Sequence, residues 1–478
     1  MSDSILSDLN PLRIVSRIAD GISDTVTDMR DAIAGDHLVI GLTGLSGNGK
    51  TTFLTSLAHF LTNDWRSLVG FPPVREGRFL GAVRCEQTDS DMPAFRLDEA
   101  EGARFGTPPR WPAPTKDISE LTLELRSRAE KSLFSFSDTR SLRVDFIDYP
   151  GEWLMDLPLL SESYREWSEG YLALIRSDPR LSSTAEPWLS RARLLEAGAE
   201  ADRQALRQLA ADFTEWLLML KNELGCSHIQ PGRFIMPGEF HDSPLLEFIP
   251  WAGEMPPDPS DLPESSFWRV MEHHYSGYVS KVVSRFYEKC FSRIDRQVVL
   301  VDCLKALEEG PACYRDIGTS LDSITRNFSY GAGSFLMRLF SRRIDRVLFA
   351  AAKCDTVPPD QHGSLRTLLR NTVEKASDGV SYSAPSVETQ YLTISSAQCT
   401  RLGVLGSGKS ERQVLCGTEN GKAFHLSGIV VPESLPEGDE YAEWKDSFRF
   451  LRPDLPEEGG IRQIRIDQAL GFLLDGYL

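Results

Sequence analysis

The residues with the clearest chemical potential form one glycine-rich segment, Gly44-Leu45-Ser46-Gly47-Asn48-Gly49-Lys50-Thr51. Its spacing is GxxxxGK(S/T), in which the glycines let the backbone curl so that several N–H groups point at a β-phosphate. The Lys50 ammonium can then reach the β- and γ-phosphates, and the Thr51 hydroxyl can bind Mg²⁺. We therefore predict a nucleoside triphosphate site whose phosphate-binding residues are Gly44, Ser46, Gly47, Asn48, Gly49, Lys50, Thr51 and Thr52.

The segments on either side of this loop are those that a phosphate loop needs. The apolar run 37–43 predicts a buried strand, and apolar residues from Thr52 to Leu61 recur with helical spacing. A helix that begins at the loop aims its N-terminal dipole at the phosphates. An ordinary glycine turn is the alternative, and it is disfavoured by the strand before the loop and the helix after it.

Two further strands supply a candidate magnesium ligand. Residues 118–125 alternate apolar and polar side chains, and the run 142–151 ends in Asp148-Tyr149-Pro150-Gly151. Asp-x-x-Gly after the second of two neighbouring strands is typical of Ras-like GTPases. There Asp148 would hold Mg²⁺ through water, and the Gly151 N–H would contact the γ-phosphate. The alternative is a turn in which Asp148 caps the strand end.

The base-binding residues are expected after two later strands. The run 346–351 is followed by Ala352 and then Lys353-Cys354-Asp355, and a carboxylate at Asp355 can accept both hydrogen bonds from the N1–H and N2 amino group of guanine. Lys353 would cover the base with its methylenes. The full GTPase pattern has Asn or Thr where this chain has Ala352, so a side chain that braces the loop is missing. After the strand 387–394, the Ala397 N–H next to Ser396 would meet the guanine O6.

Four residues near the phosphates are candidates for the chemistry of hydrolysis. Thr115 stands just before the strand 118–125, where a switch threonine closes over Mg²⁺, with Ser119 as the second candidate. Arg110 is near enough in sequence to act as an arginine finger in cis. Glu152 follows Gly151, where Ras-like enzymes place a water-orienting Gln. A carboxylate there would repel the γ-phosphate, so the role of Glu152 stays open.

Two other segments have sequence patterns that resemble parts of a nucleotide site. Residues 403–410 repeat GxxxxGK(S/T), but the residues that follow predict a β-hairpin, and without a helix the phosphate loses its main anchor. The run 298–301 ending in Asp302 could be the magnesium-binding strand of an ATPase, or simply the next core strand of a GTPase fold. Asp148 is the better magnesium candidate because Gly151 accompanies it.

The composition of the chain disfavours several classes of protein. The chain has 478 residues, is 41% hydrophobic and 25% charged, and carries a net charge of −17. This charge disfavours nonspecific binding to nucleic acid. No apolar run is long enough for a transmembrane helix, and the acidic N-terminus does not match a signal peptide. The eight cysteines form no CxxC pair and are expected to be reduced thiols in a cytoplasmic protein.

The organisation of the chain follows from these placements. Residues 1–36 contain an amphipathic helix, which we expect to pack on the body of the protein, with a dimer seam or a membrane-surface helix as alternatives. Residues 37–154 and 296–478 form the nucleotide domain, and 155–295 form a largely helical insertion. The predicted fold is an α/β P-loop NTPase three-layer sandwich with a Ras-like mixed sheet and a large helical insertion.

With these residues identified, the chain resembles the YcjX-like family of bacterial P-loop GTPases. The resemblance covers nearly the whole chain and is carried by the segments 41–46, 110–112, 115–121, 148–154 and 466–470, of which Asp-Tyr-Pro-Gly-Glu-Trp is the most specific. It implies a Ras-like nucleotide domain with a helical insertion, a stress-linked role in the cytoplasm, and cooperation with a membrane protein, through which the chain would be peripherally associated with a membrane.

The sequence therefore predicts a protein that binds GTP and GDP with Mg²⁺, hydrolyses GTP slowly, and acts as a nucleotide-dependent switch. An ATPase that uses Asp302, and a GTP sensor that does not hydrolyse its ligand, are the two alternatives. The protein partner and the oligomeric state do not follow from the sequence.

Overall fold

The computed structural model describes residues 37–45, 47–87, 91–113, 117–128, 139–227, 229–328, 344–376, 387–406, 411–456 and 462–478. Two compact units can be distinguished, and each is described by itself. The sheet unit comprises Ile33–Gly151, Ile294–Asp322 and Arg343–Leu478, and the helical unit is built around Glu152–Arg293. The predicted helix in residues 1–36 lies outside the described residues.

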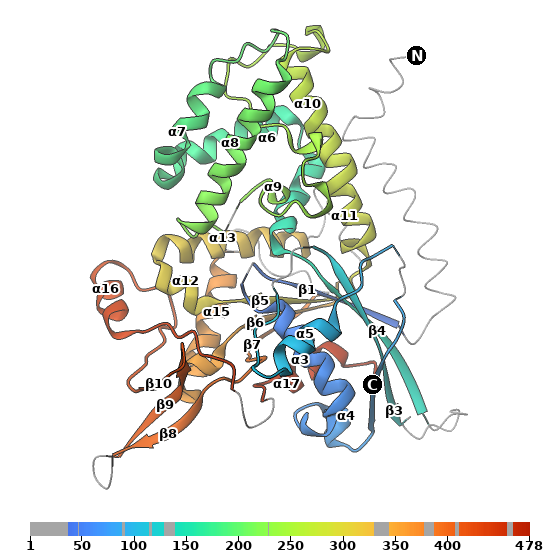
Figure 1. Ribbon diagram of the computed structural model, residues 1–478, viewed down its shortest axis with the longest axis vertical. Helices are drawn as coiled ribbons and strands as arrows, with labels where there is room; N and C mark the ends of the chain where they lie inside the picture. The colour runs from blue at the N-terminus through green and yellow to red at the C-terminus, as the bar shows by residue number, and fades with distance from the viewer. Residues whose placement is uncertain are drawn as a thin grey trace. The chain divides into compact units, whose positions relative to one another are not determined.

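The sheet unit is organised around a seven-stranded sheet (Figure 1) in the order β2-β3-β4-β1-β5-β6-β7. Strands β1, β4, β5, β6 and β7 run parallel to their neighbours in this series, whereas β3 pairs antiparallel with both β2 and β4. The mixed Ras-like sheet predicted from the sequence is confirmed, with β2 as an additional edge strand. The strands are β1 (His37–Thr43), β2 (Phe79–Arg84), β3 (Ser119–Arg128), β4 (Thr139–Asp148), β5 (Arg296–Val301), β6 (Arg346–Ala351) and β7 (Glu388–Thr393).

Helices cover both faces of this sheet. Successive strand side chains point to opposite faces, and Val298 and Leu300 of β5 share one buried cluster with α3 and α17. Helix α15 packs against β6 and β7, and its buried leucines lie outside that cluster, on the other face. The helices of the unit are α3 (Lys50–Asn63), α4 (Pro72–Arg75), α5 (Leu97–Phe105), α12 (Cys303–Glu309), α13 (Pro311–Phe328), α15 (His362–Ala376), α16 (Gly438–Ser447) and α17 (Ile466–Leu474), with 3₁₀ turns at Trp65–Ser67, Cys354–Thr356 and Pro359–Gln361.

The C-terminal helix is part of the core. Ile466, Ala469 and Leu470 of α17 are fully buried against the sheet, and Asp467 accepts a hydrogen bond of 2.7 Å from the Gly70 N–H. Helix α17 therefore belongs to the hydrophobic core of the sheet unit.

The second GxxxxGK(S/T) match begins in β8 of a small antiparallel sheet of order β10-β9-β8, which comprises β8 (Arg401–Leu405), β9 (Arg412–Glu419) and β10 (Lys422–Leu426). Asn420 and Gly421 form the β9–β10 turn with positive φ values of 52° and 72°, as a tight hairpin turn requires. The predicted hairpin is confirmed, and the residues that follow the match form strand β9, not a helix. Residues 407–410 themselves lie outside the described residues.

The helical unit begins with a long 3₁₀ segment, η2 (Gly151–Ser161), and is otherwise helical. It contains α6 (Tyr164–Ser177), α7 (Pro179–Ala192), α8 (Arg203–Asn222), α9 (Gly232–Ile235), α10 (Phe267–Tyr278), the π-helical turn η6 (Val279–Val283) and α11 (Ser284–Lys289), with 3₁₀ turns at Gly238–Phe240, Pro244–Leu246, Pro259–Asp261 and Phe291–Arg293. Within the described part of the chain, no helix is both long and apolar enough to cross a bilayer.

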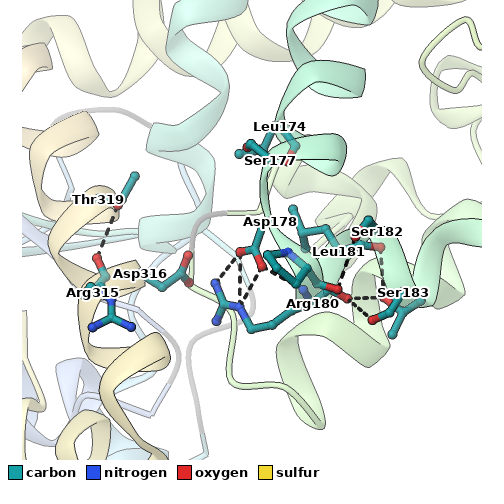
Figure 2. A network of polar contacts seen from close by, with 12 residues as sticks. Leu174, Ser177, Asp178, Arg180, Leu181, Ser182, Ser183, Arg315, Asp316 and Thr319 are labelled. Carbon is teal, nitrogen blue, oxygen red and sulfur yellow. Dashed lines mark hydrogen bonds and ion pairs between the residues drawn. The ribbon is translucent and has the colours of Figure 1, made fainter. Parts of the chain in front are cut away.

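Two helix boundaries in this unit have local causes. Helix α6 begins at Tyr164, where Ser163 caps it with a reciprocal hydrogen bond to Glu166. Helices α7 and α8 are separate, because α7 ends at Ala192 and Asp202 caps a new helix. Figure 2 shows the cap at the start of α7, which like that of α8 is an aspartate: the Asp178 carboxylate accepts hydrogen bonds from the Arg180 N–H and guanidinium.

Candidate nucleotide-binding site

The phosphate loop joins β1 to α3 in the sheet unit. Gly47 and Gly49 have φ values of 87° and 89°, which L side chains rarely adopt. Lys50, the first residue of α3, is 5% exposed, and its Nζ donates to the Gly44 carbonyl at 2.6 Å. The Asn48 amide donates to the Leu300 carbonyl at 2.9 Å, which fixes the loop to β5. The helix N-terminus and a buried ammonium thus meet where an anion would bind.

The end of β4 and the turn after it bring two predicted residues beside β1 and the start of the phosphate loop, although neither lines the cavity described below. Asp148, at the end of β4, is opposite Leu42 of β1 and is 1% exposed. A Cβ on Gly151 would lie 3.0 Å from the backbone carbonyl carbon and oxygen of Gly44, so Gly151 is packed against the phosphate loop. A carboxylate at Asp148 and a hydroxyl at Thr51 are the hard oxygen donors that Mg²⁺ prefers, so these residues fit that ion.

The loop after β6 places a carboxylate at the other end of the site. Asp355 is 5% exposed, and its Oδ2 accepts a hydrogen bond of 2.9 Å from the Cys399 N–H. Burial raises the pKa of the Asp355 carboxyl, while this N–H and nearby polar groups oppose the rise. Lys353 precedes it in the left-handed region at φ 59°.

Contacts from other segments brace this loop in place of the side chain that Ala352 lacks. The Thr356 hydroxyl donates to the Lys353 carbonyl at 2.8 Å, and the His362 Nε2 lies 2.8 Å from the Cys354 carbonyl. The Thr400 hydroxyl donates to the Asp355 carbonyl. The loop is therefore held without an Asn or Thr at its start.

Both ends of the site open into one cavity of about 500 Å³, a volume typical of small-ligand pockets. It unites residues that the sequence places more than 300 positions apart. Those predicted residues that line it are Gly47, Asn48, Gly49, Lys50, Thr51, Thr52, Lys353, Asp355, Ser396 and Ala397.

A model of the YcjX-like family, DUF463, matches residues 38–478. The chain belongs to this family. A protein of Shewanella oneidensis named Ras-like GTPase YcjX is 38% identical over 464 residues, which cover 92% of this chain and 94% of that relative. A protein of Escherichia coli K12 with the same name is 35% identical over 456 residues, covering 92% of this chain and 95% of the relative.

Several residues predicted for this YcjX-like site do not line the cavity. Gly44 is not among the lining residues, and its carbonyl accepts a hydrogen bond from the Lys50 Nζ. Arg110 is exposed and precedes Trp111, which does line the cavity. Ser46 and Thr115 lie outside the described residues.

The sequence-based reasoning missed other parts of the lining. These are Trp111, Pro112, Lys305, Thr356, Ser395, Cys399 and the segment Phe450, Leu451, Arg452 and Pro453. Trp111 stands in the Arg-Trp-Pro segment that supported the family resemblance and could have been suspected from it. No pattern in the sequence marks residues 450–453.

Asp302, the magnesium ligand of the ATPase alternative, is engaged elsewhere. It caps α12 by accepting a hydrogen bond of 3.1 Å from the Lys305 N–H, and its Oδ2 lies 2.6 Å from the Lys353 Nζ. The charge of Asp302 therefore positions Lys353 in the loop 352–355, which we call the base loop. This geometry favours Asp148 as the metal ligand.

Glu152 belongs to the helical unit, where it forms part of a buried polar cluster. Its side chain is 2% exposed and its Oε1 lies 2.8 Å from the Lys221 Nζ of α8. Nearby, the Asp156 carboxylate accepts hydrogen bonds of 2.8 Å from the Gly232 N–H and 2.5 Å from the Tyr278 hydroxyl. Segment η2 is thus anchored to three helices of its own unit.

The raised pKa of Asp156 predicts that the free energy of unfolding of the protein falls as the pH rises through weakly acidic values. Burial raises its pKa to about 6, although Tyr278, Gly232 and Arg233 oppose the rise. The folded chain keeps this proton at a pH where the unfolded chain has lost it, so the stabilisation is complete only below the unfolded pKa, at about pH 3, and is lost by about pH 7. Urea unfolding should show that the wild type loses about 3 kcal/mol relative to D156N between these two pH values.

The matched control for this prediction is E166Q, since Glu166 is exposed and hydrogen bonds with Ser163 lower its pKa. Its free energy of unfolding relative to the wild type should not follow the D156N profile. Parallel pH profiles for D156N and the wild type would show that Asp156 does not titrate in this range.

Proposed function

We propose that this protein binds GTP and GDP with Mg²⁺, hydrolyses GTP, and works as a nucleotide-dependent switch. The observation that carries the proposal is the single cavity lined both by the phosphate loop and by Lys353 and Asp355. The names of the two YcjX relatives, Ras-like GTPase, support it.

In this proposal Lys50 and the loop N–H groups bind the β- and γ-phosphates, with Gly44, Ser46, Gly47, Asn48 and Gly49 shaping the loop. Thr51, Asp148 and Thr115 hold Mg²⁺, which neutralises phosphate charge. Asp355 accepts from the Watson–Crick edge of guanine, Lys353 covers the base, and the Ala397 N–H next to Ser396 meets the O6.

Hydrolysis would be phosphoryl transfer to water, which depends on positioning and charge neutralisation. The Gly151 N–H would contact the γ-phosphate, and Arg110 would stabilise charge on the transferred group. The role of Glu152 stays open because its carboxylate is paired with Lys221.

Competition binding tests the proposed base preference. The purified chain with Mg²⁺ is titrated with fluorescent GTP, which is then competed with unlabelled GTP, GDP and ATP. Displacement by GTP and GDP but not by ATP supports guanine recognition by Asp355. Equal displacement by ATP would make the ATPase the working hypothesis.

Phosphate release distinguishes the enzyme from a sensor. A steady release that requires Mg²⁺ supports hydrolysis. Tight GTP binding without release above background would favour the non-hydrolysing sensor. Cooperation with a membrane protein and a stress-linked role stay predictions that rest on the family resemblance.

The switch should be detectable in the helical unit. Segment η2 begins at Gly151, the proposed γ-phosphate contact, and Glu152 and Asp156 anchor it to Lys221, Gly232 and Tyr278. We expect hydrogen exchange in η2 and in its partner helices α8 and α9 to differ between the GDP complex and a complex with a non-hydrolysable GTP analogue. Identical exchange in both complexes would contradict a switch that acts through this unit.

A further inference from the structure

Helix α5 carries a buried arginine that the proposed site does not yet use. Arg104 is 4% exposed, and its Nε has no hydrogen-bond partner among the described residues. A buried donor of a cation that lacks an acceptor is costly. A donor left open in this way is suited to a ligand.

The guanidinium lies beside Trp111, one of the residues that line the cavity, although Arg104 itself is not among them. Its central carbon is 5.8 Å from the centre of the Trp111 ring, and Trp111 lines the cavity together with Asp355 and Cys399. Burial lowers the pKa of Arg104, and the electrostatic influence of Cys399 and Asp355 opposes this. An arginine stays protonated in proteins, so it remains a donor.

Guanine presents acceptors that such a donor can read. Its O6 and N7 both accept hydrogen bonds, and arginine commonly donates to this pair, whereas adenine carries a donating amino group at position 6. Ala352, at the start of the base loop, supplies no side-chain donor to this edge. Asp355 would act as the acceptor at the other edge of the base, for hydrogen bonds from N1–H and the N2 amino group.

We propose that Arg104 reads the O6/N7 edge of the bound guanine, with the Trp111 ring beside its guanidinium. The inference rests on the proposed guanine-nucleotide function and names a residue that sets its specificity. Arg104 thereby supplies the side-chain donor that the base loop lacks at Ala352.

The test uses 7-deaza-GTP, in which a C–H group replaces the N7 acceptor. Dissociation constants for GTP and 7-deaza-GTP are measured with Mg²⁺ on the wild-type chain and on R104M, which keeps an apolar stem but loses the donors. We expect the wild type to bind 7-deaza-GTP about tenfold more weakly than GTP. R104M should bind GTP more weakly than the wild type does and should not distinguish the two nucleotides.

The control is R96M, at the exposed beginning of the same helix, which should keep the wild-type preference. Equal binding of GTP and 7-deaza-GTP by the wild type would overturn the role of Arg104 even if R104M fails to fold, and would leave the proposed function intact. A preference for GTP that persists in folded R104M would overturn it too. A wild-type chain that binds neither nucleotide would instead contradict the proposed function itself.

Discussion

The K50A variant should bind GTP at least 100-fold more weakly than the wild type and show no phosphate release. Lys50 is 5% exposed and lies at the first position of α3, where its ammonium is held at 2.6 Å from the Gly44 carbonyl. Charge-assisted contacts to phosphate are worth about 3 kcal/mol, which is about 100-fold in affinity. Isothermal titration with GTP and Mg²⁺, together with a phosphate-release assay, measures both effects.

The chain contains its own control for this prediction. Lys409 occupies the same place in the second GxxxxGK(S/T) match, which is followed by strand β9 and not by a helix. K409A should therefore bind and hydrolyse GTP as the wild type does. A K409A variant as impaired as K50A would place a second nucleotide site in the β8–β9 segment, and an unimpaired K50A would contradict the phosphate-loop assignment.

The second large effect is expected from Asp355. A carboxylate accepts from both N1–H and the N2 amino group of guanine, whereas the amide in D355N offers one acceptor and one donor. GTP binding should therefore weaken at least 100-fold, or about 3 kcal/mol. Xanthosine triphosphate, which carries an acceptor at position 2, should bind D355N better than it binds the wild type. Competition against fluorescent nucleotides gives both values.

Asparagine matches aspartate in size and can still accept the Cys399 N–H that Asp355 binds at 2.9 Å, so the loop should stay folded. D360N, an exposed carboxylate five residues later, serves as the matched control and should keep wild-type GTP affinity. If D355N binds GTP as tightly as the wild type does, Asp355 does not read the base.

The elements that could be predicted are those with a local cause. The glycine spacing at Gly47 and Gly49, the apolar strand before it and the helical periodicity after it are all contained within about 25 residues. The β9–β10 hairpin follows from Asn420-Gly421, whose left-handed backbone belongs to that turn.

The helical unit shows where local pattern fails. The residues of η2 are apolar enough for a regular helix, yet Asp156 is bound by the Gly232 N–H and the Tyr278 hydroxyl, from segments more than 70 residues away. Tertiary hydrogen bonds therefore hold this segment, and Pro158 within it disfavours a regular α-helix. Asp202, by contrast, was a local capping signal that the sequence already contained.

By itself, the sequence determined that this chain carries a phosphate loop on a Ras-like sheet, because glycine conformation and apolar periodicity act over short distances. Only the tertiary structure decided how the part of the cavity around Asp355 is built. The loop at Asp355 is braced by Thr400 and Cys399, and Arg104 and Trp111 lie beside it from the other half of the chain. The physical reason is that the carboxyl ends of parallel strands converge at one edge of the sheet. Residues far apart in sequence therefore share one cavity there, through contacts that no local pattern records.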